Sequence, residues 1–303
     1  MERPETSSQR NAENYVIAAR HVSPMSVEVW SSNRLPFEPK GEMIGLRDAI
    51  RRAIDGLDPA DGHALYGCYT SLDRSLCDAE NVLFYNVRDS GFPKLCAFGL
   101  TFERAFKTPP PSARPDLDAL HHHYYEMRRP AHGFRAWTEG KSIVSWRDVA
   151  IEPIDAKMGP ARAWRAMKTA SFATISSETL TTAYGLRVIV SVPRGAAFSV
   201  SSRVKPLLDG VISAFHTHDG SDLEELSSRL AATLGASQDE VARLLMSEAG
   251  TALGTRRLLW RFRAGVQWNP ADDGCVAAQV LVEESGAGWR LSGELFEVTA
   301  RRD

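Results

Sequence analysis

Residues 186–215 read LRVIVSVPRGAAFSVSSRVKPLLDGVISAF, a run of β-forming residues followed by a helical pattern. The segment 186–192, rich in valine and isoleucine, predicts a buried strand. Apolar residues recur every three or four positions over 204–215, which predicts a helix. In the rest of the chain, strands and helices follow one another without strict alternation. This mixture favours an α+β fold over a doubly wound parallel sheet, so we expect mixed or antiparallel sheets with packed helices.

The same patterns predict the remaining elements. Gly56 lies near the end of an amphipathic helix, and Ser221 and Ser237 each occupy an expected helix N-cap. A glycine-rich turn at 285–288 predicts that the last two strands form a hairpin. Strands are expected at 15–22, 26–30, 64–70, 82–87, 94–104, 143–154, 257–263, 276–283 and 289–298, and helices at 43–57, 116–127, 161–173, 222–234 and 238–248.

The proline-rich stretch 108–115 is the strongest break in the chain. Consecutive prolines hold a segment extended, so this stretch predicts a stiff linker or an exposed loop. It separates an N-terminal α+β domain, residues 13–107, from a C-terminal α+β domain, residues 116–303, which carries a helical insertion at 219–250. Residues 1–12 are polar and predict a disordered lead-in.

Composition limits the classes of function. Asp and Glu number 38 against 36 Lys and Arg, so nucleic-acid binding would need a local basic patch. Arginine outnumbers lysine, as in many proteins from GC-rich bacterial genomes. None of the 4 cysteines forms a C-x-x-C pair, which argues against a zinc ribbon. We find no signal-like leader and no long apolar run, and therefore expect a cytoplasmic protein without membrane association.

A K-P-x-x-D pattern, formed by Lys205, Pro206 and Asp209, follows a predicted strand, and the pair Asp272 and Asp273 precedes another. This arrangement resembles the RusA-type family of Holliday-junction resolvases. In that family a strand leads into a D-x-D-N-x-x-K-P-x-x-D-x-L motif, and a later turn carries paired aspartates. The resemblance implies an α+β domain that acts on branched nucleic acid with Mg²⁺ as its cofactor.

Three serines stand where that family has charged and amide side chains. Ser199 and Ser201 take the positions of the two carboxylates, and Ser202 takes that of the asparagine. Mg²⁺ prefers charged oxygen ligands, which hydroxyl groups do not supply. Metal-assisted attack on a phosphodiester needs the ion to activate water. The comparison with the family therefore implies a degenerate, non-catalytic domain.

The first half of the chain carries the missing part of the motif. Residues 77–83 read CDAENVL, in which Asp78, Glu80 and Asn81 form a D-x-[DE]-N pattern before an apolar run. One interpretation is an ancient duplication that left two similar halves, with carboxylates in one copy and the lysine in the other. The alternative is a turn in which Asp78 or Asn81 caps backbone groups.

Two histidine clusters are candidates for metal binding. His216 and His218 form an H-x-H pair that could ligate zinc, or could mark a polar helix end. His121, His122 and His123 fall in the expected helix at 116–127. Consecutive residues of a helix point in different directions, so the sequence favours an exposed or interface cluster over a chelate.

The stretch 256–263 is the best candidate for contact with nucleic acid. Its arginines can bind phosphates, and its aromatic side chains can stack on bases. On a single alternating strand, the arginines at 257, 261 and 263 face one way and Trp260 and Phe262 the other. A half-buried strand with its charged face in water would show the same pattern. The candidate nucleic-acid contacts are Lys205, Arg256, Arg257, Arg261 and Arg263.

Three hypotheses follow. The leading one is an accessory protein that engages nucleic acid, or a protein that processes it, through a degenerate resolvase-like domain. The second is a metal-dependent endonuclease that uses Mg²⁺, with Asp78, Glu80, Asp272 and Asp273 as carboxylates and Lys205 as a further catalytic candidate. The third is an assembly subunit whose tryptophans act as interface anchors.

Overall fold

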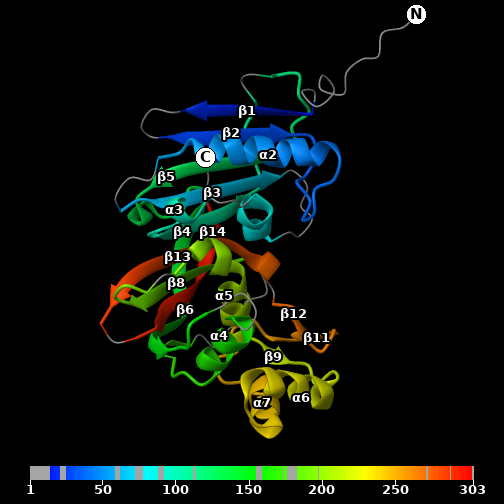
Figure 1. Cartoon of the computed structure of the whole chain (residues 1–303), viewed down its shortest axis with the longest axis vertical. Coiled ribbons are helices and arrows are strands. Elements are labelled where there is room, and N and C mark those ends of the chain that lie inside the picture. Colours follow the sequence, from blue (N-terminus) through cyan, green and yellow to red (C-terminus); the bar gives the residue numbers. More distant parts are fainter. Residues whose placement is uncertain are drawn as a thin grey trace, which may run out of the picture. The chain divides into compact units, whose positions relative to one another are not determined.

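The computed structural model describes residues 14–20, 25–58, 62–71, 78–87, 92–111, 114–154, 159–172, 174–175, 183–196, 198–270, 272–286 and 288–301. The expected lead-in at 1–12 lies outside these residues. The chain divides into two compact units (Figure 1): unit 1 comprises Met1–Trp137 with Ala300–Asp303, and unit 2 comprises Thr138–Thr299. Each unit combines helices with a sheet, which confirms the expected α+β class. No helix in the described part of the chain is both long and apolar enough to cross a bilayer.

The strands of unit 1 lie in the order β1-β2-β5-β3-β4. β3 and β4 run parallel, β5 is antiparallel to both β2 and β3, and β1 is antiparallel to β2. A parallel pair needs a crossover connection, and helical segments between β3 and β4 supply it. β3 therefore separates β4 from β5, although those two strands follow each other in the chain. The bounds are Tyr15–Arg20 for β1, Ser26–Ser31 for β2, Ala64–Ser71 for β3, Gly99–Ala105 for β4 and His121–Arg128 for β5.

A helical layer covers one face of this sheet. α2, Glu42–Asp55, buries Leu46, Ala49, Ile50 and Ile54 at helical spacing, as the sequence predicted. Each buried Leu or Ile contributes roughly 1.5–3 kcal/mol. Gly56 follows the last turn, and its N–H bonds back to the helix.

The crossover between β3 and β4 begins with η1, Asn81–Tyr85, a π-helix in which the N–H of Asn86 donates to the carbonyl of Asn81 at 2.9 Å. The strand expected at 82–87 is therefore wrong, because a short apolar run suits a buried helix as well as a strand. The run packs on β3 where Gly67 leaves room: a Cβ at that glycine would lie 2.8 Å from the Phe84 ring. α3, Phe92–Leu95, follows, so β4 starts later than the strand expected at 94–104.

The helix expected at 116–127 is also wrong, because the second part of that range belongs to β5. Its side chains alternate between the two faces of the sheet, as in any strand. The Tyr125 hydroxyl donates to the carbonyl of Leu83 at 2.9 Å, so Tyr125 faces the helical layer and Tyr124 the opposite face. Pairing with β2 on one side and β3 on the other overrides the local helical pattern.

The strands of unit 2 lie in the order β13-β8-β14-β6-β7. β8 is parallel to β13 and antiparallel to β14, and β6 pairs antiparallel with β7. The hairpin expected between the last two strands is wrong, because β8 lies between them. A tight turn reverses the chain, but it does not make the two strands neighbours when a third strand can pair with both. The bounds are Trp137–Ala150 for β6, Thr174–Ile175 for β7, Tyr184–Pro193 for β8, Cys275–Ser285 for β13 and Arg290–Ala300 for β14.

Two helices of unit 2, α4 (Gly159–Lys168) and α5 (Val200–Ala214), pack closely. A Cβ at Gly210 of α5 would lie 2.4 Å from the carbonyl oxygen of Pro160, so only glycine permits this approach. The segment between α5 and β13 holds the additional helices α6 (Leu223–Leu234) and α7 (Gln238–Leu245) and the short strands β9 (Thr217–His218) and β10 (Thr255–Arg256).

The N-caps of these two additional helices differ. Ser237 caps α7, as predicted: its hydroxyl accepts a bond from the N–H of Glu240 at 3.2 Å. Ser221 does not cap α6, whose N-cap is Asp222 with a φ of 52°. The Ser221 hydroxyl instead donates to Asp219.

The two units share a strand order. The sequence of neighbours β2-β5-β3-β4 in unit 1 matches β6-β14-β8-β13 in unit 2. In both units a helix precedes the inner strand, which is β3 in unit 1 and β8 in unit 2. A helical crossover then connects this strand to its parallel neighbour, β4 or β13. The last strand, β5 or β14, pairs with the other side of the inner strand. The edge strands differ, since β1 precedes its neighbour in the chain and β7 follows it. The shared order agrees with the expectation of two similar halves.

Candidate functional site

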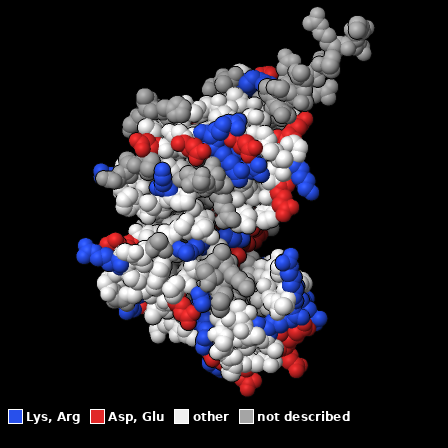
Figure 2. All heavy atoms as spheres, viewed as in Figure 1, with Lys and Arg blue, Asp and Glu red and all other residues white. Residues whose placement is uncertain are grey.

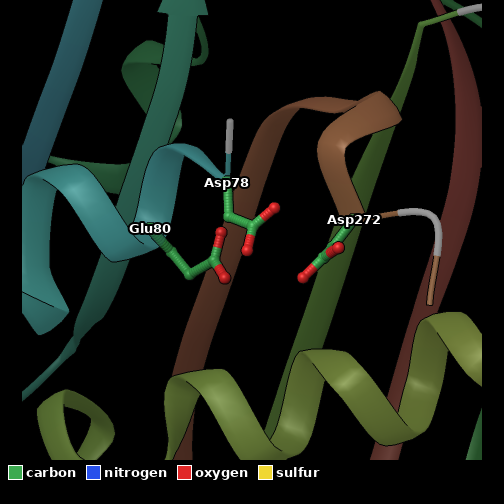
Figure 3. A group of neighbouring side chains, drawn as sticks. All are labelled: Asp78, Glu80 and Asp272. Atoms are coloured by element: carbon green, nitrogen blue, oxygen red, sulfur yellow. The ribbon is translucent and has the colours of Figure 1, made fainter. Parts of the chain in front are cut away.

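The lysine of the K-P-x-x-D pattern lies between two carboxylates of unit 2. Lys205 Nζ is 3.0 Å from Asp209 Oδ1, one turn further along α5, and 2.5 Å from Asp272 Oδ2. Asp272 extends from η3, Asp272–Gly274, the short turn that precedes β13 (Figure 3). The three side chains are mostly buried, with exposed fractions of 23%, 16% and 13%. The structure thus brings together three of the residues that carried the resemblance.

The charges of this cluster decide what it can do. An ion pair that is mostly out of water is stable only when each charge keeps its partner. The ammonium group of Lys205 occupies the place between carboxylate oxygens that a hard divalent cation would take. A Mg²⁺ ion would have to displace the lysine, so the donor set of unit 2 does not fit that ion while Lys205 is present. The two acids also draw Lys205 away from phosphate contacts.

The three serines lie at the start of α5. Ser199 is the N-cap residue, and its hydroxyl oxygen is 3.2 Å from that of Ser201. The hydroxyl of Ser202 donates to the carbonyl of Ser199 at 3.1 Å. These hydroxyls therefore bond to one another or to the backbone and add no negative charge. Asp273 follows Asp272 in η3, but Asp272 is the aspartate that contacts Lys205.

Asp78 and Glu80 stand at the start of the crossover of unit 1, beside the π-helix η1. Asn81 donates its side-chain N–H to Asp78 Oδ2 at 2.7 Å, and the backbone N–H groups of Asn81 and Val82 donate to the carbonyl of Asp78. Glu80 is 3% exposed. Figure 3 shows the carboxylates of Asp78 and Glu80 extending to the same side of this segment. Adjacent carboxylates suit a divalent cation, and π-helices are frequent at functional sites.

The carboxylates of unit 1 and the serines of unit 2 occupy equivalent points of the shared topology. Residues 78–81 begin the crossover from β3 to its parallel neighbour β4. Residues 199–202 begin the crossover from β8 to its parallel neighbour β13. The D-x-[DE]-N pattern and its serine counterpart thus agree in place as well as in spacing.

The basic, aromatic stretch 256–263 forms a hairpin in unit 2. β11, Leu259–Phe262, pairs antiparallel with β12, Gly265–Trp268. Leu259 is buried, whereas Trp260 and Phe262 are 43% and 50% exposed. The aromatic face of the hairpin therefore meets water. Arg261, on the other face, is also exposed, so the half-buried strand with only its charged face in water is not what the structure shows.

Arginines lie beside both exposed rings. The guanidinium carbon of Arg257 is 3.9 Å from the centre of the Trp260 ring, and that of Arg263 is 5.2 Å from the centre of the Phe262 ring. Arg257 also pairs with Asp222 at 2.6 Å. Figure 2 shows Lys and Arg atoms, with some acidic ones, at the edge where Figure 1 labels β11, β12 and α6.

The arginines of the stretch 256–263 differ in the groups that they bond to. Arg261 pairs with Asp222 at 3.3 Å and with Glu225 at 2.8 Å, so its charge is partly neutralised. Arg256 lies on β10, and its carbonyl accepts a bond from the N–H of Asp219. Arg263 sits at the hairpin turn with a φ of 52° and has no ion pair within the described part of the chain. Arg263 is therefore the arginine of the hairpin best placed to bind an external anion.

The H-x-H pair at 216 and 218 is buried next to cations. His216 Nδ1 is 3.1 Å from the carbonyl oxygen of Gly254. Burial, with a smaller contribution from the charges of Arg256 and Lys168, lowers the pKa of His216 to about 4. His218 Nδ1 is 3.0 Å from Asp219 Oδ1. The nearby cations oppose a metal ion, and the described residues supply no third His, Cys or carboxylate grouped with this pair.

The histidines at 121–123 lie on β5 and are buried, so the expectation of an exposed cluster is wrong, whereas that of an interface cluster stays a prediction. His121 Nδ1 is 2.8 Å from the Tyr69 hydroxyl, and His122 Nε2 is 3.2 Å from Glu28 Oε2. Burial lowers the pKa of His123 to about 3, which keeps that ring neutral. These histidines belong to the core of unit 1, on alternate faces of its sheet.

The third hypothesis, in which tryptophans are interface anchors, depends on which of them reach the surface. Of the 7 tryptophans, all within the described ranges, only Trp260 is exposed.

Burial raises the pKa of the Cys68 and Cys96 thiols to about 12, so neither is a nucleophile at neutral pH. No disulfide joins the described cysteines, and Cys77 lies outside the described residues.

Comparison with known proteins gives a negative result. No protein-family model, curated protein or solved structure matches this chain. The resemblance to RusA-type resolvases therefore stays a prediction, carried by the K-P-x-x-D pattern and the late aspartate pair.

One candidate site left no local motif in the sequence. A cavity of about 760 Å³ lies on the face of the unit 1 sheet opposite the helical layer, and its floor includes Tyr66 and Tyr124. Beneath it, Glu103 is fully buried and accepts bonds from the Tyr66 hydroxyl and from the N–H groups of Arg135 and Ala136. The sequence shows only the polar run HHHYYEMR of β5; once this run forms a strand, every second one of its side chains lies on the cavity face.

Proposed function

We propose that this protein is a nucleic-acid-binding accessory protein of the bacterial cytoplasm, which has no nuclease activity and binds through the β11–β12 hairpin of unit 2. The observation that carries the proposal is the exposed pair Trp260 and Phe262, with Arg257 and Arg263 beside the two rings. Neighbouring exposed aromatic side chains mark interaction surfaces. Aromatic rings stack on bases of any sequence, and arginines bind phosphates, so this surface suits a single-stranded or junction segment.

The absence of catalysis in this proposal rests on the cluster around Lys205. Two carboxylates hold the lysine, and serines stand where a resolvase-like site needs charged ligands. A site of this composition lacks the charge that a catalytic Mg²⁺ requires. In this proposal the hairpin of unit 2 binds the nucleic acid, whereas the resolvase-like pattern around Lys205 lacks the ligands that cleavage would need.

The test is fluorescence anisotropy with a labelled single-stranded oligonucleotide and a labelled four-way junction, titrated at two salt concentrations. Trp260→Ala combined with Phe262→Ala should weaken binding at least about tenfold, since stacking contributes roughly 1–3 kcal/mol per base. Arg263→Gln should reduce the slope of log K against log salt by about 0.7, the value for one phosphate contact on a single strand.

Matched controls exist on the same unit. Met246→Ala removes a 42% exposed apolar side chain at the C-cap of α7, and Arg194→Gln removes an arginine whose side chain is 91% exposed. Both control variants should bind like the wild type. The proposal fails if the wild type does not bind either nucleic acid at low salt, or if the hairpin variants bind as tightly as the controls.

A second candidate function is the Mg²⁺-dependent nuclease, which one observation in unit 1 favours. Asp78 and Glu80 place two carboxylates on the same side of the segment before the π-helix. If this function is correct, the protein cleaves a branched DNA with Mg²⁺ or Mn²⁺, and Asp78→Asn abolishes cleavage. Asp118→Asn, at an exposed site of the same unit, should leave it intact. Absence of metal-dependent cleavage by the wild type removes this candidate.

A further inference from the structure

The cavity of unit 1 has the size and the lining of a small-molecule site. Its volume of about 760 Å³ falls in the range of roughly 300–1,000 Å³ typical of ligand pockets. All of its described lining residues belong to unit 1, including Ala300 and Arg301 near the C-terminus. Its floor is the face of β2, β3 and β5 that α2 does not cover, and one wall is the segment after β4 that leads into the proline-rich stretch.

The wall formed by the segment after β4 is held on the sheet by a hydrogen bond. The indole N–H of Trp30, on β2, donates to the carbonyl of Pro109 at 2.8 Å. The opposite wall is fixed by the buried Glu103 carboxylate, which accepts the N–H groups of Arg135 and Ala136. Arg301 donates to the carbonyl of Trp137 and closes the rim. The cavity is therefore held open by bonded elements on both sides, which favours a preformed site.

The interior is aromatic. Tyr66 and Tyr124 line the floor, and Phe106 and Trp137 line the walls. Phe106 is 41% exposed and stands edge-on to the Trp137 ring, with 6.2 Å between ring centres. An aromatic ring exposed to this extent can stack on a flat heterocycle.

The rim is cationic. Lys107, Arg135 and Arg301 line the cavity, are exposed, and come from three different segments. Glu28 is the one carboxylate among the described lining residues, and it bonds to His122. Arg135 pairs with Glu126 at 2.7 Å, below the rim. An anion is thus favoured at the mouth of the cavity, and arginine suits phosphate in particular because of its forked donors.

We propose that unit 1 binds a nucleoside phosphate, with the base stacked among the aromatic side chains and the phosphate held by the cationic rim. The aromatic interior and the cationic rim together point to a ligand that is flat at one end and anionic at the other. This site is independent of the hairpin in unit 2, and neither proposal requires the other.

The experiment is isothermal titration calorimetry of the full chain with AMP, adenosine and inorganic phosphate. AMP should bind at least about tenfold more tightly than either fragment, because adenosine lacks the charge-assisted bonds to phosphate and inorganic phosphate lacks the stacked base. Arg301→Gln should weaken AMP about tenfold and leave adenosine unchanged. Phe106→Ala should weaken AMP and adenosine alike. The matched controls are Arg129→Gln and Phe98→Ala, exposed residues of unit 1 that do not line the cavity.

Several results would overturn this assignment. AMP that binds no more tightly than inorganic phosphate would show a cationic surface without a base site. AMP affinity that is equal in the wild type, Arg301→Gln and Phe106→Ala would place the ligand elsewhere. A loss of AMP binding in the Trp260→Ala, Phe262→Ala variant would transfer the site to the hairpin.

Discussion

Replacing Lys205 by methionine would test whether the two aspartates beside it depend on its charge. Methionine keeps the length and the apolar stem of the side chain but removes the ammonium group. Asp209 and Asp272 would then face each other at exposed fractions of 16% and 13% without their cation. Removing one partner of a buried ion pair costs roughly 3–5 kcal/mol. Because these side chains keep some contact with water, we expect a loss of about 3 kcal/mol in the free energy of unfolding.

The assay is urea denaturation of the full chain followed by circular dichroism and tryptophan fluorescence, with separate transitions fitted if the two units unfold separately. Asp272→Asn added to Lys205→Met should recover about 1–2 kcal/mol, because the repulsion between the two carboxylates is then removed. Mg²⁺ should stabilise Lys205→Met more than the wild type, since the ion can occupy the place of the ammonium group. Lys141→Met, at an exposed position of unit 2, is the control. The reasoning is refuted if Lys205→Met and Lys141→Met lose equal stability.

Two further predictions concern the core. The pKa of His123 is lowered from 6.5 to about 3 in the folded state, so protons bind the unfolded chain first and stability falls as the pH drops from about 6.5 towards 3. In urea titrations near pH 4, this effect should lower the free energy of unfolding by about 3 kcal/mol. His123→Leu should make the free energy of unfolding depend less on pH. The control His132→Leu, at an exposed position, should leave the pH dependence unchanged. Gly210→Ala should lose about 1–3 kcal/mol by pushing α4 from α5, whereas Gly286→Ala, with open space around it, should change stability by less than about 0.5 kcal/mol. Equal melting temperatures for the two glycine variants would contradict the close helix contact.

Strong periodic patterns predicted most elements, and the failures have physical causes. The amphipathic helix α2, with its end at Gly56, and the strand β8 were both expected from spacing and composition alone. The apolar run after Asn81 could not be assigned, because periodicity does not separate a short buried helix from a strand. β5 was mistaken for a helix because its partners β2 and β3 lie far away in sequence.

The candidate site was predicted in part. The spacing of Lys205 and Asp209 places them one helical turn apart, and the resemblance also singled out the aspartate pair that contains Asp272. The sequence alone could not predict that Lys205 contacts both aspartates at once. The exposure of Trp260 and Phe262 was not predictable either, because alternation separates the two faces of a strand without indicating which one packs on α6. The cavity of unit 1 depends on six segments that are separate in sequence, which no local pattern joins.

The place of β14 has a consequence for synthesis of the protein. This strand is synthesised after β6, β8 and β13, yet it pairs with β8 well inside the order of unit 2 and has β6 on its other side. Until it emerges, the nascent chain carries unpaired strand edges on both β8 and β6, which are templates for aggregation. Unit 2 can therefore complete its sheet only after β14 has been synthesised. A stop codon only a few codons upstream of β14 would abolish the unit rather than trim it.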